Sequence, residues 1–137
     1  MQRIIIAIAA SLLATGAQAV ELKIEGLKSN QGRLMVAAFD SGDSWLRKPV
    51  LAKTVDASAV KDGTLSIDWP ELDGLPRAAL TVFHDLNGNG KLDTNAMGMP
   101  TEPLGYSNNA VGNFGPARFD AAVFEPKPGQ RQQIRLN

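Results

Sequence analysis

The sequence contains no cysteine and one histidine, His84, among its 137 residues. Without cysteine there is no disulfide framework, and no thiolate can act as a nucleophile or a metal ligand. A single histidine cannot build a multi-histidine zinc site. The fold must therefore be held by its apolar core, with a bound metal as the other possible support.

An excess of charge of either sign is also missing. The 14 Lys and Arg residues balance the 14 Asp and Glu residues, and the charges form no long run of one sign. A nucleic-acid-binding protein would need a basic patch, and a solvating tail would need an acidic one. We therefore expect no nucleic-acid partner.

Only one long apolar run is present, and it lies at the start of the chain. Arg3 precedes the run Ile4 to Leu13, and Ala17-Gln18-Ala19 follows it. A basic start, a short apolar segment and a small-x-small site are typical of a secretory signal peptide, and the run is too short to span a membrane. We expect a signal peptide at 1–19, a single domain at 20–137 without a membrane span, and a periplasmic or secreted location. A buried N-terminal helix is the alternative.

Short segments with period-two alternation dominate the rest of the chain. In "VELKIEGL" the apolar side chains of Val20, Leu22 and Ile24 share one face, as in a half-buried strand. No segment shows a convincing helical period. The pattern predicts an all-β fold, an antiparallel β-sandwich of the immunoglobulin-like or transthyretin-like kind, although a closed barrel would show the same periodicity. Seven strands are expected, at residues 20–27, 33–40, 51–58, 63–69, 77–84, 118–125 and 130–137.

The connection at 85–117 is long for a domain of this size and has no clear strand. Its composition of Gly, Asn, Pro and aromatic residues is that of an ordered loop, not of a charged or repetitive tail. Long loops in compact domains usually carry function or bind an ion. We expect this loop to be folded against the sandwich.

The loop begins with "DLNGNGKLD", in which oxygen-bearing side chains recur at every second position. Asp85, Asn87, Asn89 and Asp93 match positions 1, 3, 5 and 9 of a calcium-binding EF-hand loop, and the carbonyl of Lys91 matches position 7. Position 6 is glycine, as a sharp turn requires. The sequence predicts a weak, structural calcium site.

Two features separate this loop from a complete EF-hand. The flanking helices are absent, and position 12 is Ala96 where a bidentate Glu is usual. Glu102 is a candidate for the missing ligand. The alternative to a calcium site is a glycine-rich turn in which Asn and Asp make local hydrogen bonds.

Residues 82–124 resemble the signature of an uncharacterised exported bacterial family, domain-of-unknown-function family 2141. The similarity lies in His-Asp-x-Asn-x-Asn-Gly-x-x-Asp beginning at His84, followed by "GMPTE", "GYSNN" and Gly-Pro-x-x-Phe-x-x-Ala ending at Ala122. The resemblance implies an exported β-sandwich. It implies no established activity.

Catalytic constellations are weak. His84 and Asp85 are adjacent in a predicted strand, so their side chains should point to opposite faces and cannot readily form a dyad. We expect His84 to bond to the backbone of the long loop. Glu71 and Asp73 occupy a solvated turn between prolines. Four aromatic residues could together bind a sugar or peptide. Three of them are expected instead to pin the long loop to the sandwich, and Trp45 is the best candidate for an exposed contact. The others are Tyr106, Phe114 and Phe119.

The sequence thus favours a monomeric, non-enzymatic binding or accessory module of the bacterial cell envelope, stabilised by calcium. Its partner would be an envelope protein or a glycan. The alternative is a hydrolase that acts on a carbohydrate or ester near His84 and the calcium loop.

Overall fold

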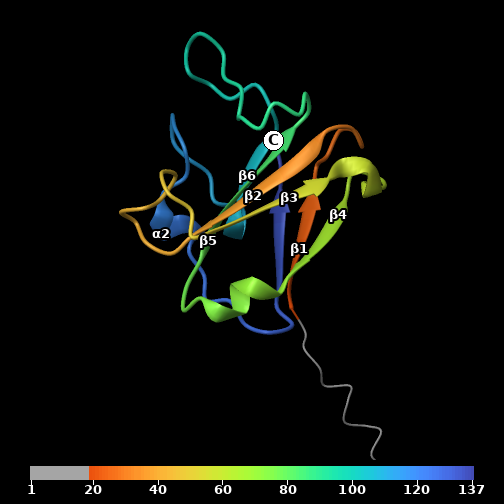
Figure 1. Cartoon of the computed structure of the whole chain (residues 1–137). Coiled ribbons are helices and arrows are strands. Elements are labelled where there is room, and N and C mark those ends of the chain that lie inside the picture. Colours follow the sequence, from red (N-terminus) through yellow and green to blue (C-terminus); the bar gives the residue numbers. More distant parts are fainter. Residues whose placement is uncertain (1–18) are drawn as a thin grey trace, which may run out of the picture.

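The computed structural model describes residues 19–137, so the predicted signal peptide lies, apart from Ala19, outside the described residues. Two sheets, in the orders β4-β1-β7 and β3-β2-β5-β6, form an all-β sandwich (Figure 1). They are separate sheets, which settles the choice between sandwich and barrel. The strands are β1 Val20–Glu25, β2 Arg33–Phe39, β3 Leu51–Asp56, β4 Leu65–Trp69, β5 Ala79–Asp85, β6 Leu104–Tyr106 and β7 Arg131–Arg135.

Strand β1 is the centre of the smaller sheet. It pairs antiparallel with β4 and parallel with β7, so that Leu22 lies opposite Ile67, and Ile24 opposite Ile134. Alternate residues of β1 are fully buried, as the period-two pattern predicted. The register therefore places one apolar face of this sheet against its partner sheet.

Strand β2 is central in the larger sheet and pairs antiparallel with β3 and β5. Its inward residues Leu34 and Val36 join the core, together with Leu80 and Val82 of β5. The core is continuous between the sheets and includes Trp69, which is 3% exposed. This core, together with a smaller apolar cluster around Tyr106 and Ala122, replaces the disulfides that the sequence lacks.

The two sheets are joined along one side by β6. Leu104 and Asn137 exchange backbone hydrogen bonds of 3.2 and 3.1 Å, which connect β6 to the segment that follows β7. Gly105 permits this approach, because a Cβ atom there would lie 2.8 Å from the carbonyl oxygen of Arg135. The position of β6 is therefore fixed from both sides.

Two sequence predictions about the elements were wrong. The strand expected at 118–125 is a short helix, α2 Phe119–Ala122, and only Phe124 forms an isolated bridge, with Ala78. Conversely, β6 lies inside the long connection that was expected to have no strand. Val123, at the C-terminal end of α2, is half-buried. The remaining elements are the short 3-10 helices η1 Ala57–Ala59, η2 Pro70–Gly74 and η3 Ser107–Asn109.

The register makes a prediction about stability. Ile67 is 5% exposed in the core, whereas Glu21 faces outward and pairs with Arg131 at 2.8 Å. Ile67→Ala should lower the free energy of unfolding by about 2–5 kcal/mol, because a buried side chain is truncated. Glu21→Ala should cost about 1 kcal/mol or less, because it removes only an exposed ion pair. Equal losses for the two variants in urea titrations would show that the register is wrong.

Candidate metal centre

The site begins where β5 ends. His84 follows the inward parity of Leu80 and Val82, whereas Asp85 follows the outward parity of Thr81, and both are completely buried. The predicted opposition of His84 and Asp85 is thus consistent with the strand register. The chain that leaves β5 covers the side chain of Asp85, which is why an outward carboxylate has no exposure.

A close backbone contact fixes this strand end. Gly32 has φ of +73°, and a Cβ atom at this position would collide with the carbonyl oxygen of Asp85. Only glycine tolerates both the left-handed backbone and the contact. The turn before β2 therefore packs directly against the start of residues 85–93, the calcium-type loop.

The two oxygens of the Asp85 carboxylate have different surroundings. Oδ2 accepts a hydrogen bond of 2.8 Å from the backbone N–H of Gly90 and lies 4.0 Å from Nε of Arg33. Oδ1 is buried and has no hydrogen-bond partner within the described residues. A buried carboxylate oxygen without a partner is costly, and such an atom commonly marks a bound ion or water.

The two asparagines of the loop make the local bonds of a tightly wound turn. Oδ1 of Asn87 accepts from the N–H of Asn89 at 3.1 Å, and Oδ1 of Asn89 accepts from the N–H of Lys91 at 2.9 Å. Both glycines of the loop, at 88 and 90, have positive φ. Each asparagine therefore makes the local hydrogen bond that the glycine-turn interpretation requires.

Asp93 is where the loop side chains meet. Its two carboxylate oxygens accept hydrogen bonds from the side-chain amides of Asn87 and Asn89, at 2.7 and 2.8 Å. The amide N–H groups thus satisfy the carboxylate oxygens that a cation would otherwise bind. A cation that binds here must replace these two hydrogen bonds, which lowers the net affinity.

Glu102 does not simply extend the ligand set, because it already closes the loop. Oε2 accepts from the N–H of Leu86 at 2.9 Å, and Oε1 accepts from the N–H of Asp93 at 3.1 Å. Glu102 is only 7% exposed. One carboxylate therefore clamps both ends of the segment between Leu86 and Asp93.

Arg33 is a part of the site that the sequence did not reveal. It lies opposite Asp85 in the β2–β5 register, and its Nη2 donates to the carbonyl of Gly88 at 2.6 Å. No spacing in the sequence relates these residues, because only strand pairing brings them together. Across residues 19–137, no group of three or more His, Cys, Asp or Glu residues is arranged to hold a metal. The amide and carbonyl oxygens must therefore be part of any ligand set here.

His84 lies in the core and away from this loop chemistry. Its Nε2 is 2.6 Å from the carbonyl oxygen of Gln31 and therefore donates to it, while the buried Nδ1 has no partner within the described residues. The prediction that His84 bonds to the backbone of the long loop is confirmed for its main chain, because the N–H of His84 donates to the carbonyl of Pro103 at 2.9 Å. The side chain bonds instead to the β1–β2 turn. His84 lines neither of the two cavities described in the structure.

The aromatic residues divide into a packed group and one exposed residue. Trp45 contacts the rings of Phe39, Tyr106 and Phe119, and its Nε1 donates to Ala117 at 2.9 Å, so it is not the exposed contact that the sequence suggested. Burial raises the pKa of the Tyr106 hydroxyl, which keeps it neutral.

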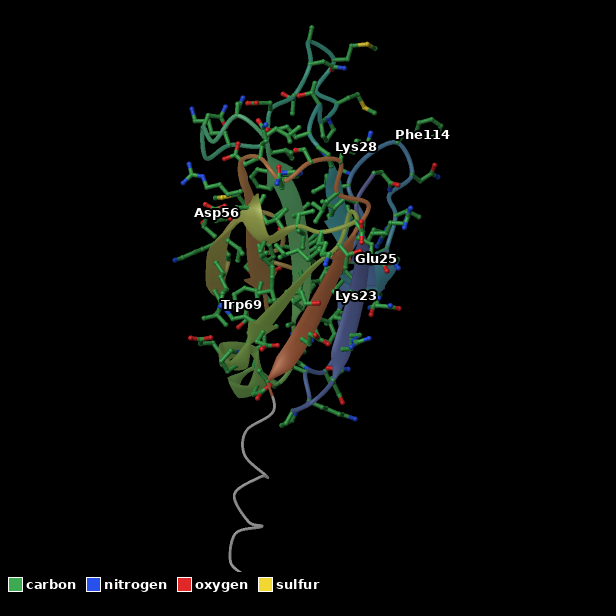
Figure 2. All side chains as sticks on the ribbon, turned by 90° about the vertical axis from the view of Figure 1, so that its right-hand side faces the viewer. Lys23, Glu25, Lys28, Asp56, Trp69 and Phe114 are labelled. Atoms are coloured by element: carbon green, nitrogen blue, oxygen red, sulfur yellow. The ribbon has the colours of Figure 1, made fainter. Side chains whose placement is uncertain are left out.

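Phe114 is the exposed aromatic residue. It is fully exposed and has φ of +62°, a backbone conformation that bulky residues rarely adopt (Figure 2). The expectation that Phe114 pins the loop is wrong, because its ring has no packing partner to hold it down.

An apolar groove of about 1070 Å³ lies beside the calcium-type loop. Its floor is the outer face of β5 and β6, including Phe83 and Leu104, and its walls come from residues 92–102 and 109–116. Four wall residues are large, apolar and strongly exposed. They are Met97, Met99, Val111 and Phe114.

These features define a small all-β protein in which a loop of calcium-binding spacing extends from one end of a sandwich. The chain belongs to domain-of-unknown-function family 2141, described as uncharacterized proteins conserved in bacteria, which it matches over residues 22–134. The resemblance inferred from the loop motifs is thereby confirmed. No curated protein and no solved structure matches the chain. Within residues 19–137, the helices are too short or too polar to cross a membrane.

The Glu102 clamp can be tested by a substitution that preserves its shape. Glu102→Gln should lower the free energy of unfolding by about 1–3 kcal/mol, because one of the two backbone N–H groups loses its charged acceptor. Hydrogen exchange should accelerate first at the amides of Leu86 and Asp93. The exposed Glu125→Gln is the matched control. Equal exchange rates at these two amides in the wild type and the Glu102 variant would contradict the clamp.

Proposed function

We propose that this protein is an exported, non-enzymatic binding module of the bacterial cell envelope, in which a weak calcium site stabilises the loop that walls its binding groove. Export is supported by the signal-peptide pattern at residues 1–19. The ligands of the ion would be Asp85, Asn87, Asn89, Asp93 and the carbonyl of Lys91. Glu102 would support the loop and contribute negative charge.

The observation that carries the calcium proposal is the unpartnered Oδ1 of Asp85. The other oxygen of this carboxylate is bound to Gly90, the glycine at position 6, so the carboxylate lies at the base of the loop. A divalent cation at the loop centre would give Oδ1 the partner that it lacks. Calcium suits the site better than magnesium, because calcium accepts an irregular set of protein oxygens, whereas magnesium demands near-ideal octahedral geometry.

The affinity should be modest. Asp85 and Asp93 are the two carboxylates in the loop, Arg33 lies beside the first, and two amide hydrogen bonds must be broken at the second. These terms favour a dissociation constant of about 10⁻⁴–10⁻³ M, the range of extracellular modules. The ion would then act as a structural element and would not signal changes in calcium concentration.

The binding role is supported by the groove. Its exposed methionines, Val111 and Phe114 form an apolar surface, and methionine-rich surfaces adapt to varied partners. The lining is mainly apolar, and two of its polar groups, the Glu102 carboxylate and the Oδ1 of Asn109, already accept backbone N–H groups. A glycan would need such groups, so we favour an apolar segment of an envelope protein as the partner.

The hydrolase alternative gains no support from the position of His84. The imidazole is completely buried in the core, and the groove is not lined by it. A general base must reach its substrate within hydrogen-bond distance. We therefore develop only the binding role.

Calcium should raise the melting temperature. At free calcium about 100-fold above the dissociation constant, binding adds ~2.7 kcal/mol, equivalent to roughly 10 °C for a domain of this size. Asp85→Asn and Asp93→Asn should each remove most of this shift, because each loses a charged ligand, while Asp68→Asn on the outer face of β4 should keep it. Magnesium at equal concentration controls for ionic strength. A shift of the same size in all three variants would contradict the site.

The groove should bind an apolar fluorescent dye such as an anilinonaphthalene sulfonate. Phe114→Ser should weaken dye binding about fivefold or more, corresponding to about 1 kcal/mol, because it removes the most exposed aromatic contact. Val50→Ser, which removes an exposed apolar side chain outside the groove lining, is the matched control. If both variants bound the dye like the wild type, the groove would not be the binding surface.

A further inference from the structure

The tip of the 86–103 connection is a tight hairpin organised by Asn95. The N–H of Asn95 donates to the carbonyl of Met99 at 2.8 Å, and its own carbonyl accepts from Gly98 at 2.9 Å. Its side-chain Oδ1 accepts from the N–H groups of Met97 and Met99, at 2.9 and 3.0 Å. The backbone that carries the two methionines is therefore fixed by four hydrogen bonds to a single residue.

The side chains on this fixed backbone are free. Met97 is 86% exposed and Met99 is 57% exposed, and both line the same groove. Ala96 and Gly98 beside them are too small to obstruct either thioether. A methionine side chain has three rotatable bonds, so two thioethers separated by one residue in a turn can turn toward one ion.

We propose that Met97 and Met99 form a two-thioether site for a soft monovalent cation of the Cu(I) class. Thioether sulfur is a soft ligand that selects Cu(I) over Ca²⁺ or Mg²⁺. The chain has no cysteine, so no thiolate competes for the ion. Its other methionines are Met1 and Met35. Two protein ligands leave some coordination positions of the ion open. Such a site suits transfer of the ion to another carrier better than tight storage.

This site is independent of the proposed calcium site, because the two use donors of opposite hardness on different parts of the connection. The competing explanation is that the methionines serve only as apolar walls of the groove. Leucine would also form an apolar wall of similar size, but it cannot bind a soft metal. Substitution by leucine therefore separates the two explanations while keeping size and apolarity.

The test uses Ag(I), a soft monovalent cation that needs no reductant, added as nitrate in chloride-free buffer to protein with ¹³C-labelled methionine methyl groups. The methyl resonances of Met97 and Met99 should shift together and saturate at one Ag(I) per protein. The resonance of Met35 should not move, because its sulfur is half-buried and accepts from Thr54. Calcium at high concentration should not displace Ag(I).

Met97→Leu and Met99→Leu should each weaken Ag(I) binding about tenfold or more, because each removes one of two ligands. Met35→Leu is the matched control and should bind like the wild type. Melting temperatures should be unchanged in the loop variants, since both side chains are exposed. Full affinity in either single loop variant, or the absence of saturable binding to the wild type, would overturn the proposal.

Discussion

The connection between β5 and β6 depends on one buried carboxylate, that of Glu102. Its two oxygens bind the N–H groups of Leu86 and Asp93, so the chain that leaves β5 is tied to the chain that returns toward β6. Directly after this clamp, β6 begins at Leu104, pairs with β5 and bonds to Asn137. The clamp therefore fixes the ends of the calcium-type loop directly beside β6, whose own position is fixed by β5 and Asn137. Its hydrogen bonds are worth more in part-buried surroundings than they would be at the surface.

The connection between β5 and β6 carries two kinds of metal-binding donor at its two ends. Hard oxygen donors lie at its base, where Asp85 is buried beneath the turn, and soft sulfur donors lie at its exposed hairpin tip. The tip is itself bonded to the base, because the N–H and hydroxyl of Thr101 both donate to the carbonyl of Asp93. An ion held at the base would thus reduce the freedom of the tip and of the adjacent groove wall. Stability at one end and recognition at the other would be coupled through a few hydrogen bonds.

The sequence predicted the strands that carry clean alternation, because burial of one face leaves a period of two. It failed at β6, where three residues are too few to show a period, and at 119–122, where "FDAA" fits a helical turn as well as a strand. The spacing of Asn87, Asn89 and Asp93 indicated that these side chains would meet in one turn, and Asp93 does accept from both asparagines. The sequence could not predict the contact of Arg33 with Gly88, or the bond from His84 to Gln31, because strand pairing brings together residues that are more than fifty positions apart. The exposure of Phe114 also depends on backbone geometry that composition does not encode.

The most direct test of the account is a crystal structure of the protein grown or soaked in millimolar calcium. The account predicts one ion within residues 85–93, with oxygen ligands at about 2.3–2.6 Å. Oδ1 of Asp85 should be among these ligands, and the amides of Asn87 and Asn89 should have turned their oxygens toward the ion. Density that shows no ion, with Asp93 still accepting both amide N–H groups and Oδ1 of Asp85 bound to water, would contradict the calcium site and leave a glycine-rich turn held by Glu102.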